Sequence, residues 1–283
     1  MDGQVVAMYV RSQLKKAVDN LKVVGPIPCL ATVLVGEDPA SASYIKNKQK
    51  AATEVGIITS DHRLSSNSTQ KDLLDLIYRL NQDSSVHGIL VQLPLPKNID
   101  EFTIINAINP AKDVDGLTPF NAGMLLNSKA IITPCTPSGI MELLDFYKVD
   151  VNTMDAVIVN RSNLVGKPLA LLLLERNATV TICHSLTKDL NYKLRSADLV
   201  ITAVGDRENF MLTAETVKNG AVVIDVGITR IRGKLKGDVD FESVKEKVSW
   251  ITPVPGGVGP MTVCMLLKNT LSAALSFNTG MNQ

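Results

Sequence analysis

The chain has 283 residues, of which 45% are hydrophobic and 20% are charged. This length allows one large or two medium domains with real cores, and the composition is ordinary for a soluble globular protein. A formal net charge of +1 gives no electrostatic case for binding nucleic acid or an anionic membrane surface. No apolar run is as long as a membrane span, and the N-terminus lacks a signal segment, so we expect a cytoplasmic protein with no membrane partner.

The chain has four cysteines and three histidines. Cys29, Cys135, Cys183 and Cys264 are scattered without a CxxC pair, and only Cys183 has a histidine, His184, beside it. These spacings argue against a structural zinc site, and we expect no bound metal. We expect the cysteines to be reduced and mostly buried, as in cytosolic proteins.

Short apolar runs alternate with helical patterns along almost the whole chain, which predicts an α/β architecture with parallel sheets. The predicted strands cover residues 29–35, 88–91, 156–159, 179–183, 199–204, 221–226 and 250–251. The predicted helices cover residues 5–21, 40–55, 70–81, 139–147, 167–176, 214–218 and 263–277.

A domain boundary is predicted between residues 118 and 137, where three prolines crowd a segment of weak pattern. From residue 156 onward the rhythm of strands and helices is typical of a dinucleotide-binding Rossmann domain. We therefore expect a two-domain protein with a substrate domain of residues 1–118 and 263–283 and a cofactor domain of residues 119–262. Ligands usually bind in the cleft between two such domains.

Residues 156–168 predict a strand, a tight loop and a helix, which is where a Rossmann unit holds a pyrophosphate against a helix N-terminus. In this loop only Gly166 is a glycine, and Asn160 stands where the first glycine of the usual motif would be. Because asparagine tolerates the left-handed backbone conformation, the turn remains possible. Gly205 and Gly227 follow later strands and would let the backbone approach a cofactor closely.

The end of the next strand bears on the choice of cofactor. NAD sites usually have an acidic residue there, which accepts a hydrogen bond from the ribose 2′-hydroxyl. Here the strand over residues 179–183 ends in His184 and Ser185, with no acid. Together with Arg161 and Ser162 these residues could hold a 2′-phosphate, which favours NADP over NAD. The alternative is a polar, solvated loop.

The first half of the chain carries a tyrosine and a lysine at helical spacing. Tyr44 and Lys48 are four residues apart, so they share one face of the predicted helix. A ring for stacking and an amine for polarising a carbonyl or moving a proton would suit an active site. The alternative is a solvated basic face, because Lys46 and Lys50 lie on the same helix.

Three further segments have unusual patterns. Gln92 leaves a buried strand just before two prolines, which predicts that its amide lies at the carboxyl edge of the sheet. Asp115 lies in the Asp-Val-Asp-Gly turn of residues 113–116. Residues 252–262 contain three prolines and three glycines, which predicts a rigid loop that holds a flat polar ligand or an anion, or only connects two elements.

Six motifs follow one another along the chain. They are VGxDPAS…YxxxK, VQLPLP, KDVDG, PCTPxG, RSxxVGxP and PVPGGVGPMT, at residues 35–48, 91–96, 112–116, 134–139, 161–168 and 253–262. In this order the motifs closely resemble the bifunctional methylenetetrahydrofolate dehydrogenase/cyclohydrolase family, and the resemblance covers nearly the whole chain. In that family NADP⁺ takes a hydride from 5,10-methylenetetrahydrofolate, and the methenyl product is hydrolysed to 10-formyltetrahydrofolate in the same cleft.

The resemblance implies a folate site in which Lys48 is the key catalytic residue and Gln92 hydrogen-bonds to it. Tyr44 would stack on the folate ring system, and Asp115 would bind the amino edge of the pterin. The implied substrate-binding set also includes two residues beside Gln92 and a loop that closes over the substrate, namely Val91, Leu93, Pro253, Gly256, Gly257, Val258 and Gly259.

For the cofactor, the resemblance implies that Thr136 and Ile228 lie near the nicotinamide and that a homodimer forms through the cofactor domain. Asn160, Arg161, Ser162 and Ser185 would lie around the adenosine and its phosphates. The expected cofactor-binding set also includes Val165, Gly166, His184, Ala203, Gly205 and Gly227. The chain departs from the family twice. Asn160 replaces a glycine that the family usually has. The early Asp-Gly-Lys reads Asp2-Gly3-Gln4, so that a first short strand is shortened or missing.

Three alternatives remain open at the level of sequence. The first is a dehydrogenase without useful cyclohydrolase activity. The second is another two-domain NADP dehydrogenase, such as one of the shikimate type, against which the VQLPLP and PVPGGVGPMT segments argue. The third is a folate-binding protein that has lost catalysis, against which the presence of Tyr44, Lys48, Gln92 and Asp115 argues.

Overall fold

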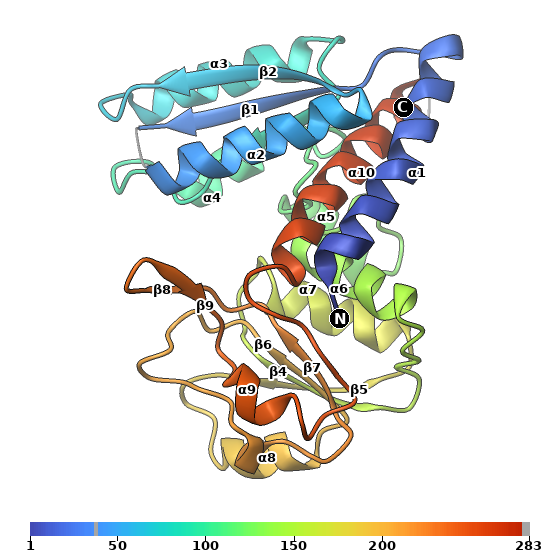
Figure 1. Ribbon diagram of the computed structural model, residues 1–283. Helices are drawn as coiled ribbons and strands as arrows, with labels where there is room; N and C mark the ends of the chain where they lie inside the picture. Colours follow the sequence, from blue (N-terminus) through green and yellow to red (C-terminus); the bar gives the residue numbers. More distant parts are fainter. Residues whose placement is uncertain (37–38, 279–283) are drawn as a thin grey trace. The chain divides into compact units, whose positions relative to one another are not determined.

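The computed structural model describes residues 1–36 and 39–278, and the side chains of residues 24, 39–44, 277 and 278 lie outside this description. The chain divides into two compact units. One comprises Tyr9–Cys135 with Val263–Gln283, and the other comprises Met1–Met8 with Thr136–Thr262. Each contains a parallel sheet, after which we name them the three-stranded unit and the five-stranded unit (Figure 1). The predicted α/β fold is confirmed.

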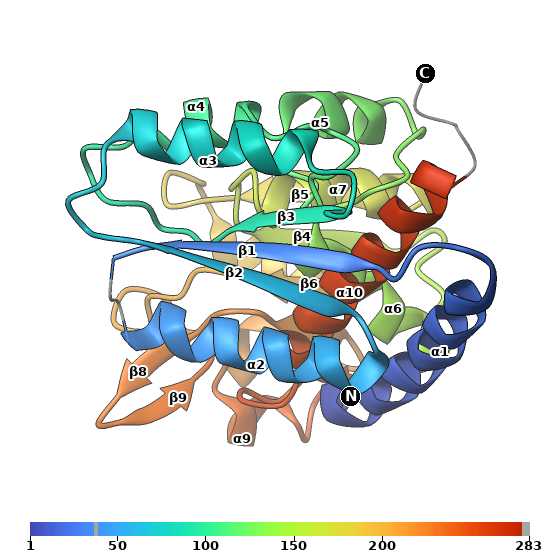
Figure 2. The same cartoon turned by 90° about the horizontal axis from the view of Figure 1, so that it is seen from above.

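In the described part of the three-stranded unit the strands run parallel in the order β2-β1-β3. They are β1 (Cys29–Val35), β2 (Ile58–Leu64) and β3 (Gly88–Val91). Helix α2 (Pro39–Val55) covers one face of the sheet and α3 (Gln70–Gln82) covers the other (Figure 2). The other helices are α4 (Glu101–Asn106) and α5 (Pro119–Leu126), while α1 (Gly3–Val24) and α10 (Val258–Asn278) each continue from one unit into the other.

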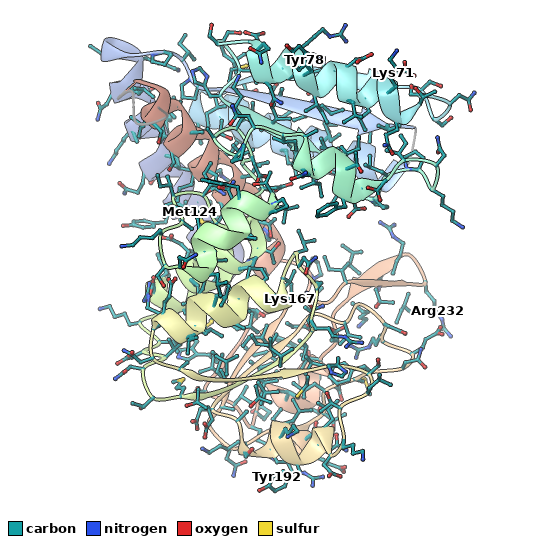
Figure 3. All side chains as sticks on the ribbon, turned by 180° about the vertical axis from the view of Figure 1, so that it is seen from behind. Lys71, Tyr78, Met124, Lys167, Tyr192 and Arg232 are labelled. Carbon is teal, nitrogen blue, oxygen red and sulfur yellow. The ribbon has the colours of Figure 1, made fainter. Side chains whose placement is uncertain are left out.

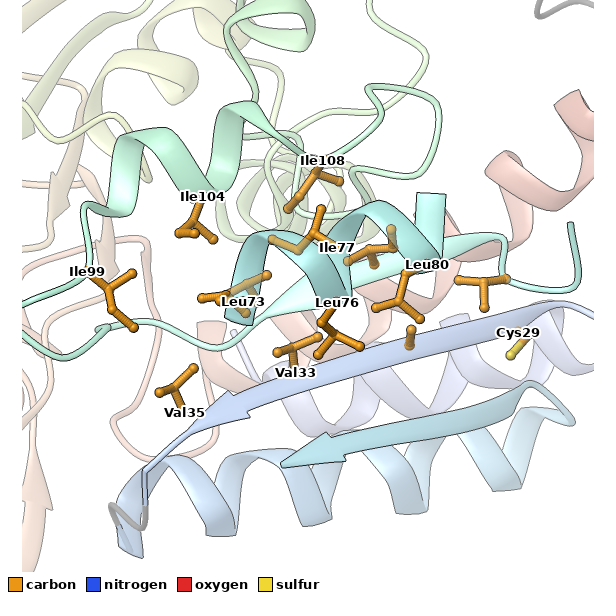
Figure 4. Packing of buried hydrophobic residues seen from close by; sticks show 14 residues of the cluster. Cys29, Val33, Val35, Leu73, Leu76, Ile77, Leu80, Ile99, Ile104 and Ile108 are labelled. Atoms are coloured by element: carbon orange, nitrogen blue, oxygen red, sulfur yellow. The ribbon is translucent and has the colours of Figure 1, made fainter. Parts of the chain in front are cut away.

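Helix α3 shows how the sequence builds the core of this unit. Thr69 and Asp72 form a capping box at its start, in which each side chain accepts a hydrogen bond from the backbone N–H of the other residue. Such a cap contributes about 1 kcal/mol. Apolar residues three and four positions apart share one helix face. This face packs on the sheet through a cluster that includes Leu73, Leu76, Ile77, Leu80, Ala31, Val33, Val35, Ile89 and Val91 (Figure 4).

In the described part of the five-stranded unit the strands run parallel in the order β10-β7-β6-β4-β5. They are β4 (Asp155–Val159), β5 (Thr179–Cys183), β6 (Leu199–Thr202), β7 (Val222–Asp225) and β10 (Trp250–Ile251). The other elements are α6 (Cys135–Phe146), α7 (Gly166–Glu175), α8 (Leu190–Ser196), a 3₁₀ turn (Ala214–Thr216), the antiparallel hairpin β8 (Thr229–Ile231) and β9 (Lys234–Lys236), and α9 (Phe241–Val244).

The strand order gives β4 a special position. Its chain neighbour β5 lies on one side of it, and β6, which comes next in the chain, lies on the other. The connections that leave these strands therefore diverge at the carboxyl end of β4. In open parallel sheets ligands bind at such a switch point. The fold thus directs attention to the loops after β4, β5 and β6.

Each predicted strand is present and differs from the prediction only at its ends. Three strands of the described chain were missed, namely β2, β8 and β9. Strand β2 is an edge strand whose central residues, Thr59 to Arg63, are polar, so it has no apolar run to predict it. The helix predicted over residues 214–218 is only a 3₁₀ turn. Among the described residues, α1 begins at Gly3 and no strand precedes it.

The prediction of a loop over all of residues 252–262 is wrong in its second half. Helix α10 begins at Val258 and contains Gly259 and Pro260 in its first turn. Proline is tolerated there because its missing N–H would have no partner within the helix. The loop proper therefore ends at Gly257.

One helical segment of the described chain, Val258–Ser276, is long and apolar enough to cross a membrane by length and composition. This corrects the expectation that no such run exists. About 61% of the segment is buried inside the fold, as expected for a core helix. All four cysteines lie among the described residues and are buried and free, as predicted.

Candidate active site

Lys48 and Gln92 are hydrogen-bonded to each other at the carboxyl end of the three-stranded sheet. Lys48 lies on α2 and is only 8% exposed. Its Nζ donates a hydrogen bond of 3.1 Å to Gln92 Oε1. The Gln92 amide is itself held, since Nε2 donates to the Leu93 carbonyl (2.8 Å) and the backbone N–H donates to the Val33 carbonyl (2.9 Å). A buried amine whose partner is fixed in this way has a defined orientation.

Asp115 lies in the same unit and belongs to this electrostatic environment. Burial raises the pKa of its carboxyl group, and the positive charge of Lys48 opposes that rise. The neighbouring Asp113 has a different role. Its carboxylate accepts hydrogen bonds from the Thr118 N–H (2.7 Å) and from Asn121 Nδ2 (2.9 Å), and it is buried. Asp113 therefore fixes the turn, which leaves Asp115 as the acid available to a ligand.

A small hollow brings Asp115 together with the predicted substrate residues Val91 and Leu93. Its volume is about 10 Å³, room for about one water molecule, and its wall is mostly apolar. The hollow is too small for an aromatic ring, and it shows only that Asp115 shares an apolar surface with Val91 and Leu93.

Two residues of this site were missed by the sequence reasoning, namely Cys135 and Asn269. The Cys135 thiol donates to the Val114 carbonyl (3.3 Å) and to Asp115 Oδ1 (3.5 Å). Burial, and then the charge of Asp115, raise the pKa of this thiol well above its usual range, so it acts as a hydrogen-bond donor and not as a thiolate nucleophile.

Asn269 Nδ2, from α10, donates to the Val114 carbonyl (2.8 Å) and to the Thr133 carbonyl (2.9 Å). It ties the Asp115 turn to the segment before Cys135. An amide in a largely apolar helix was the available signal, because a buried amide needs partners.

Tyr44 lies on α2, one helical turn before Lys48. Its side chain is outside the described residues. The predicted loop residues Pro253, Gly256 and Gly257 belong to the five-stranded unit. There the Gly3 N–H donates to the Gly256 carbonyl (2.9 Å), and a Cβ on Gly3 would overlap the Gly257 carbonyl. The first turn of α1 therefore fixes this loop. Val258 and Gly259 follow in the first turn of α10.

Asn160 organises the loop after β4. Its Oδ1 accepts hydrogen bonds from the Ser162 N–H (2.8 Å) and the Gly166 N–H (3.0 Å), and its Nδ2 donates to the Ala203 carbonyl (2.6 Å). Asn160 is not among the residues with positive φ, so the turn does not use the left-handed conformation that asparagine tolerates. The asparagine supports the turn through its side chain instead. It also links the loop after β4 to the loop after β6.

The loop after β4 packs closely on the start of α7. A Cβ on Gly166 would overlap the Asn160 carbonyl, so only glycine lets the loop approach the helix this closely. The Gly166 N–H donates to Asn160 Oδ1 (3.0 Å) and the Lys167 N–H donates to the Ser162 carbonyl (3.1 Å), so the first N–H groups of the helix have partners within the loop. Lys167, labelled in Figure 3, adds a positive charge in this first turn. A tight loop with a positive charge at the carboxyl end of β4 is compatible with a dinucleotide phosphate.

The four residues predicted to meet a 2′-phosphate lie at one sheet edge. Arg161 and Ser162 follow β4, while His184 and Ser185 follow β5, and the ends of these two strands are paired. Arg161, Ser162 and Ser185 are exposed. The Leu186 N–H donates to His184 Nδ1 (3.2 Å), which orients that ring.

The remaining cofactor candidates lie near the ends of β6 and β7. Gly205 has φ of +68° and lies close to Ile228, which is 45% exposed. A Cβ on Gly227 would overlap the Asp238 carboxyl group. Glycine is therefore required at position 227 by Asp238, whereas the prediction had invoked a cofactor. Thr136 hydrogen-bonds to Thr262 through the two hydroxyl oxygens (3.0 Å).

Comparison with known proteins decides the family. Residues 1–115 match the tetrahydrofolate dehydrogenase/cyclohydrolase catalytic domain, and residues 134–278 match the NAD(P)-binding domain of the same family. The chain belongs to this family. The bifunctional protein FolD of Cenarchaeum symbiosum is 59% identical over 97% of this chain and 97% of its own length.

Solved structures agree. The FolD dehydrogenase/cyclohydrolase of Campylobacter jejuni has a TM-score of 0.94 at 48% identity and covers 97% of this chain and 98% of its own. FolD of Trypanosoma brucei, solved with NADP cofactor and inhibitor, has a TM-score of 0.92 at 38% identity and covers 100% and 98%. The chain is therefore a methylenetetrahydrofolate dehydrogenase and methenyltetrahydrofolate cyclohydrolase that uses NADP, as predicted.

These findings also bear on the alternatives. The relatives are named as bifunctional proteins, which gives no support to a dehydrogenase alone or to a binding protein without catalysis. Shikimate dehydrogenase of Thermus thermophilus has a TM-score of 0.54 at 14% identity. That similarity is one of fold alone, so the shikimate-type alternative is not supported.

Proposed function

We propose that both reactions take place at one folate site centred on Lys48, with Gln92, Asp115 and Tyr44. The observation that carries this proposal is the buried hydrogen bond between Lys48 Nζ and Gln92 Oε1, within the electrostatic influence of Asp115. Asp115 would bind the amino edge of the pterin. Tyr44, on the same helix face as Lys48, would stack on its ring.

The chemistry is consistent with this residue set. The hydride leaves a carbon that lies between two nitrogens, so the cation formed is delocalised and no strong base is needed. NADP⁺ supplies the hydride acceptor when it is bound. In the hydrolytic step water adds to the methenyl carbon, one carbon–nitrogen bond breaks and a proton is released. Lys48, oriented by Gln92, would hydrogen-bond at the reacting centre and direct the attacking water.

An assay of the whole enzyme tests this proposal. The protein is mixed with 5,10-methylenetetrahydrofolate and either NADP⁺ or NAD⁺, and reduced cofactor and methenyl product are followed separately. Reduction of NADP⁺ without accumulation of the methenyl compound is the expected result. Accumulation of the methenyl compound at the rate of NADP⁺ reduction would contradict the hydrolytic assignment.

We assign the cofactor to the loop that carries Asn160 and Ser162 for the pyrophosphate and to Arg161 with Ser185 for the 2′-phosphate. The position of this loop at the carboxyl end of β4, where the strand order switches, and the close approach of Gly166 to Asn160 support this assignment. The NADP bound in the Trypanosoma brucei relative supports the preference for NADP over NAD. The proposed domain ranges are residues 1–118 with 263–283 for folate and residues 119–262 for NADP.

We further propose a cytoplasmic homodimer that pairs through the free edge of β5. This strand ends the five-stranded sheet. Exposed apolar side chains lie on or after it, with Ile182 39%, Leu186 77% and Tyr192 73% exposed (Figure 3). Light scattering should give a dimer, and the double variant Ile182→Lys, Leu186→Lys should give a monomer, whereas Val23→Lys on α1 should not. A wild-type monomer would refute the proposal.

A further inference from the structure

Two buried acids outside the predicted site lie between the ends of β6 and β7. Asp225 is the last residue of β7 and is 4% exposed, and Asp238, between β9 and α9, is fully buried. Burying a carboxyl group is costly unless it accepts several hydrogen bonds. The hydrogen-bond partners of the two carboxyl groups therefore indicate their structural role.

Asp238 accepts hydrogen bonds from the loop after β6. Its Oδ2 accepts from the Val204 N–H (2.7 Å) and its Oδ1 accepts from the Gly205 N–H (2.9 Å). Ala203 and Gly205 in this loop are cofactor candidates. The two oxygens thus fix two successive peptide groups, including the one that enters the left-handed conformation of Gly205.

Asp225 in turn holds the segment that carries Asp238. Its Oδ1 accepts from the Asp238 N–H (2.9 Å) and its Oδ2 accepts from the Val239 N–H (3.0 Å). The Thr202 hydroxyl also donates to Asp225 Oδ1 (3.3 Å). Burial raises the pKa of Asp225 to about 6, and the hydrogen bonds from Asp238 and Val239 oppose this rise. A chain of contacts therefore runs from β7 through Asp238 to the loop after β6.

Two glycines fit tightly around these acids. A Cβ on Gly227 would overlap the Asp238 carboxyl group, and a Cβ on Gly237 would overlap that of Asp225. The loop after β7, which carries the candidates Gly227 and Ile228, is therefore packed directly against Asp238. Asp238 therefore contacts both loops that carry these cofactor candidates.

We propose that Asp238, held by Asp225, is a positioning residue that fixes the loops of residues 203–205 and 227–228 for binding NADP. This proposal rests on the proposed location of the cofactor. The role requires a carboxylate, because two N–H groups need two acceptors. Asparagine has one acceptor oxygen, and its NH₂ group would face an N–H without bonding to it. The backbone of the loop after β6 would then shift.

The test uses the variant Asp238→Asn in the full-length enzyme. We expect its KM for NADP⁺ to rise at least tenfold while kcat at saturating NADP⁺ stays within threefold. Hydrolysis of added methenyltetrahydrofolate, which consumes no NADP⁺, should be unchanged. The matched control is Asp240→Asn, which removes a carboxylate charge two residues after Asp238. The Asp240 side chain makes no cap hydrogen bond to α9. The KM of this control variant should equal that of the wild type.

A KM for NADP⁺ within twofold of the wild type in Asp238→Asn would overturn the proposal, as would an equal loss of both activities, which indicates a general structural role. If this variant does not fold, Asp238→Ser, which keeps one small acceptor, replaces it with the same expected results. Failure of the proposed function is distinguishable, because the wild-type enzyme itself would then lack turnover with NADP⁺.

Discussion

The two units of the chain use buried polar groups in different ways. In the three-stranded unit, Lys48 and Gln92 are hydrogen-bonded to each other, and we propose that their side chains contact the folate. In the five-stranded unit, Asn160 and Asp238 accept hydrogen bonds from backbone N–H groups of loops, and we propose that these loops bind NADP through their backbone. The folate reactions should therefore depend on the chemistry of a few side chains, and NADP binding on the shape of loops.

The largest expected effect tests the dependence of the folate reactions on single side chains in the three-stranded unit. Lys48→Met should lower the rate of methenyl hydrolysis by about 100-fold or more, which is typical for loss of a group that acts on a proton or on water. The melting temperature should stay close to that of the wild type, because methionine fills the same space. The control is Lys46→Met, at an exposed position on the same helix. Hydrolysis at the wild-type rate in Lys48→Met would refute the role.

The next effect concerns Arg161 and Ser185, whose side chains we expect to determine the preference for NADP⁺ over NAD⁺. The double variant Arg161→Ala, Ser185→Ala should raise the KM for NADP⁺ about tenfold or more, because charge-assisted hydrogen bonds to a phosphate are lost. The KM for NAD⁺ should not rise. Arg195→Ala with Ser196→Ala, on α8 of the same unit, is the control. Equal KM values for NADP⁺ in the variant and the wild type would show that the 2′-phosphate binds elsewhere.

A smaller effect is expected from Asn269, which supports the Asp115 turn in the three-stranded unit. Asn269→Leu removes both donors to the Val114 and Thr133 carbonyls. The loss of these two hydrogen bonds to buried carbonyls should lower the free energy of unfolding by about 2 kcal/mol. Because the Asp115 turn loosens, the KM for methylenetetrahydrofolate should rise while that for NADP⁺ does not. Denaturant unfolding and steady-state kinetics measure the two effects, and a raised KM for NADP⁺ instead would contradict this account.

The smallest effect is a pH dependence of stability in the three-stranded unit. His87 is 2% exposed, and its Nδ1 accepts from the Cys29 N–H (3.2 Å). Burial and the charge of Lys112 lower its pKa from 6.5. Below pH 6.5 the unfolded chain binds a proton that the folded chain does not, so stability falls by at most about 1.4 kcal/mol per pH unit until the lowered pKa is reached. His87→Asn should have a shallower slope there, and an unchanged slope would contradict this.

The strands next to the proposed folate and NADP sites could be predicted because buried parallel strands are nearly continuous apolar runs, as in β1 and β4. Lys48, Gln92 and Asp115 could be predicted because each lies at a recognisable place in the sequence. Lys48 lies on a predicted helix, Gln92 follows a predicted strand, and Asp115 lies in a predicted turn. Asn269 and Asp238 could not, since their importance depends on carbonyl and N–H groups far away in the sequence. Asn160 was found for the wrong reason, because its side chain and not its backbone conformation supports the turn.

The most direct test measures two quantities on the same preparations of Lys48→Met and Asp238→Asn. These are the rate of methenyl hydrolysis and the dissociation constant of NADP⁺ by calorimetric titration. The account predicts opposite patterns. Lys48→Met should lose hydrolysis and bind NADP⁺ as the wild type does, while Asp238→Asn should hydrolyse normally and bind NADP⁺ at least tenfold more weakly. Parallel losses in both quantities in both variants would contradict the separation of side-chain chemistry from loop shape.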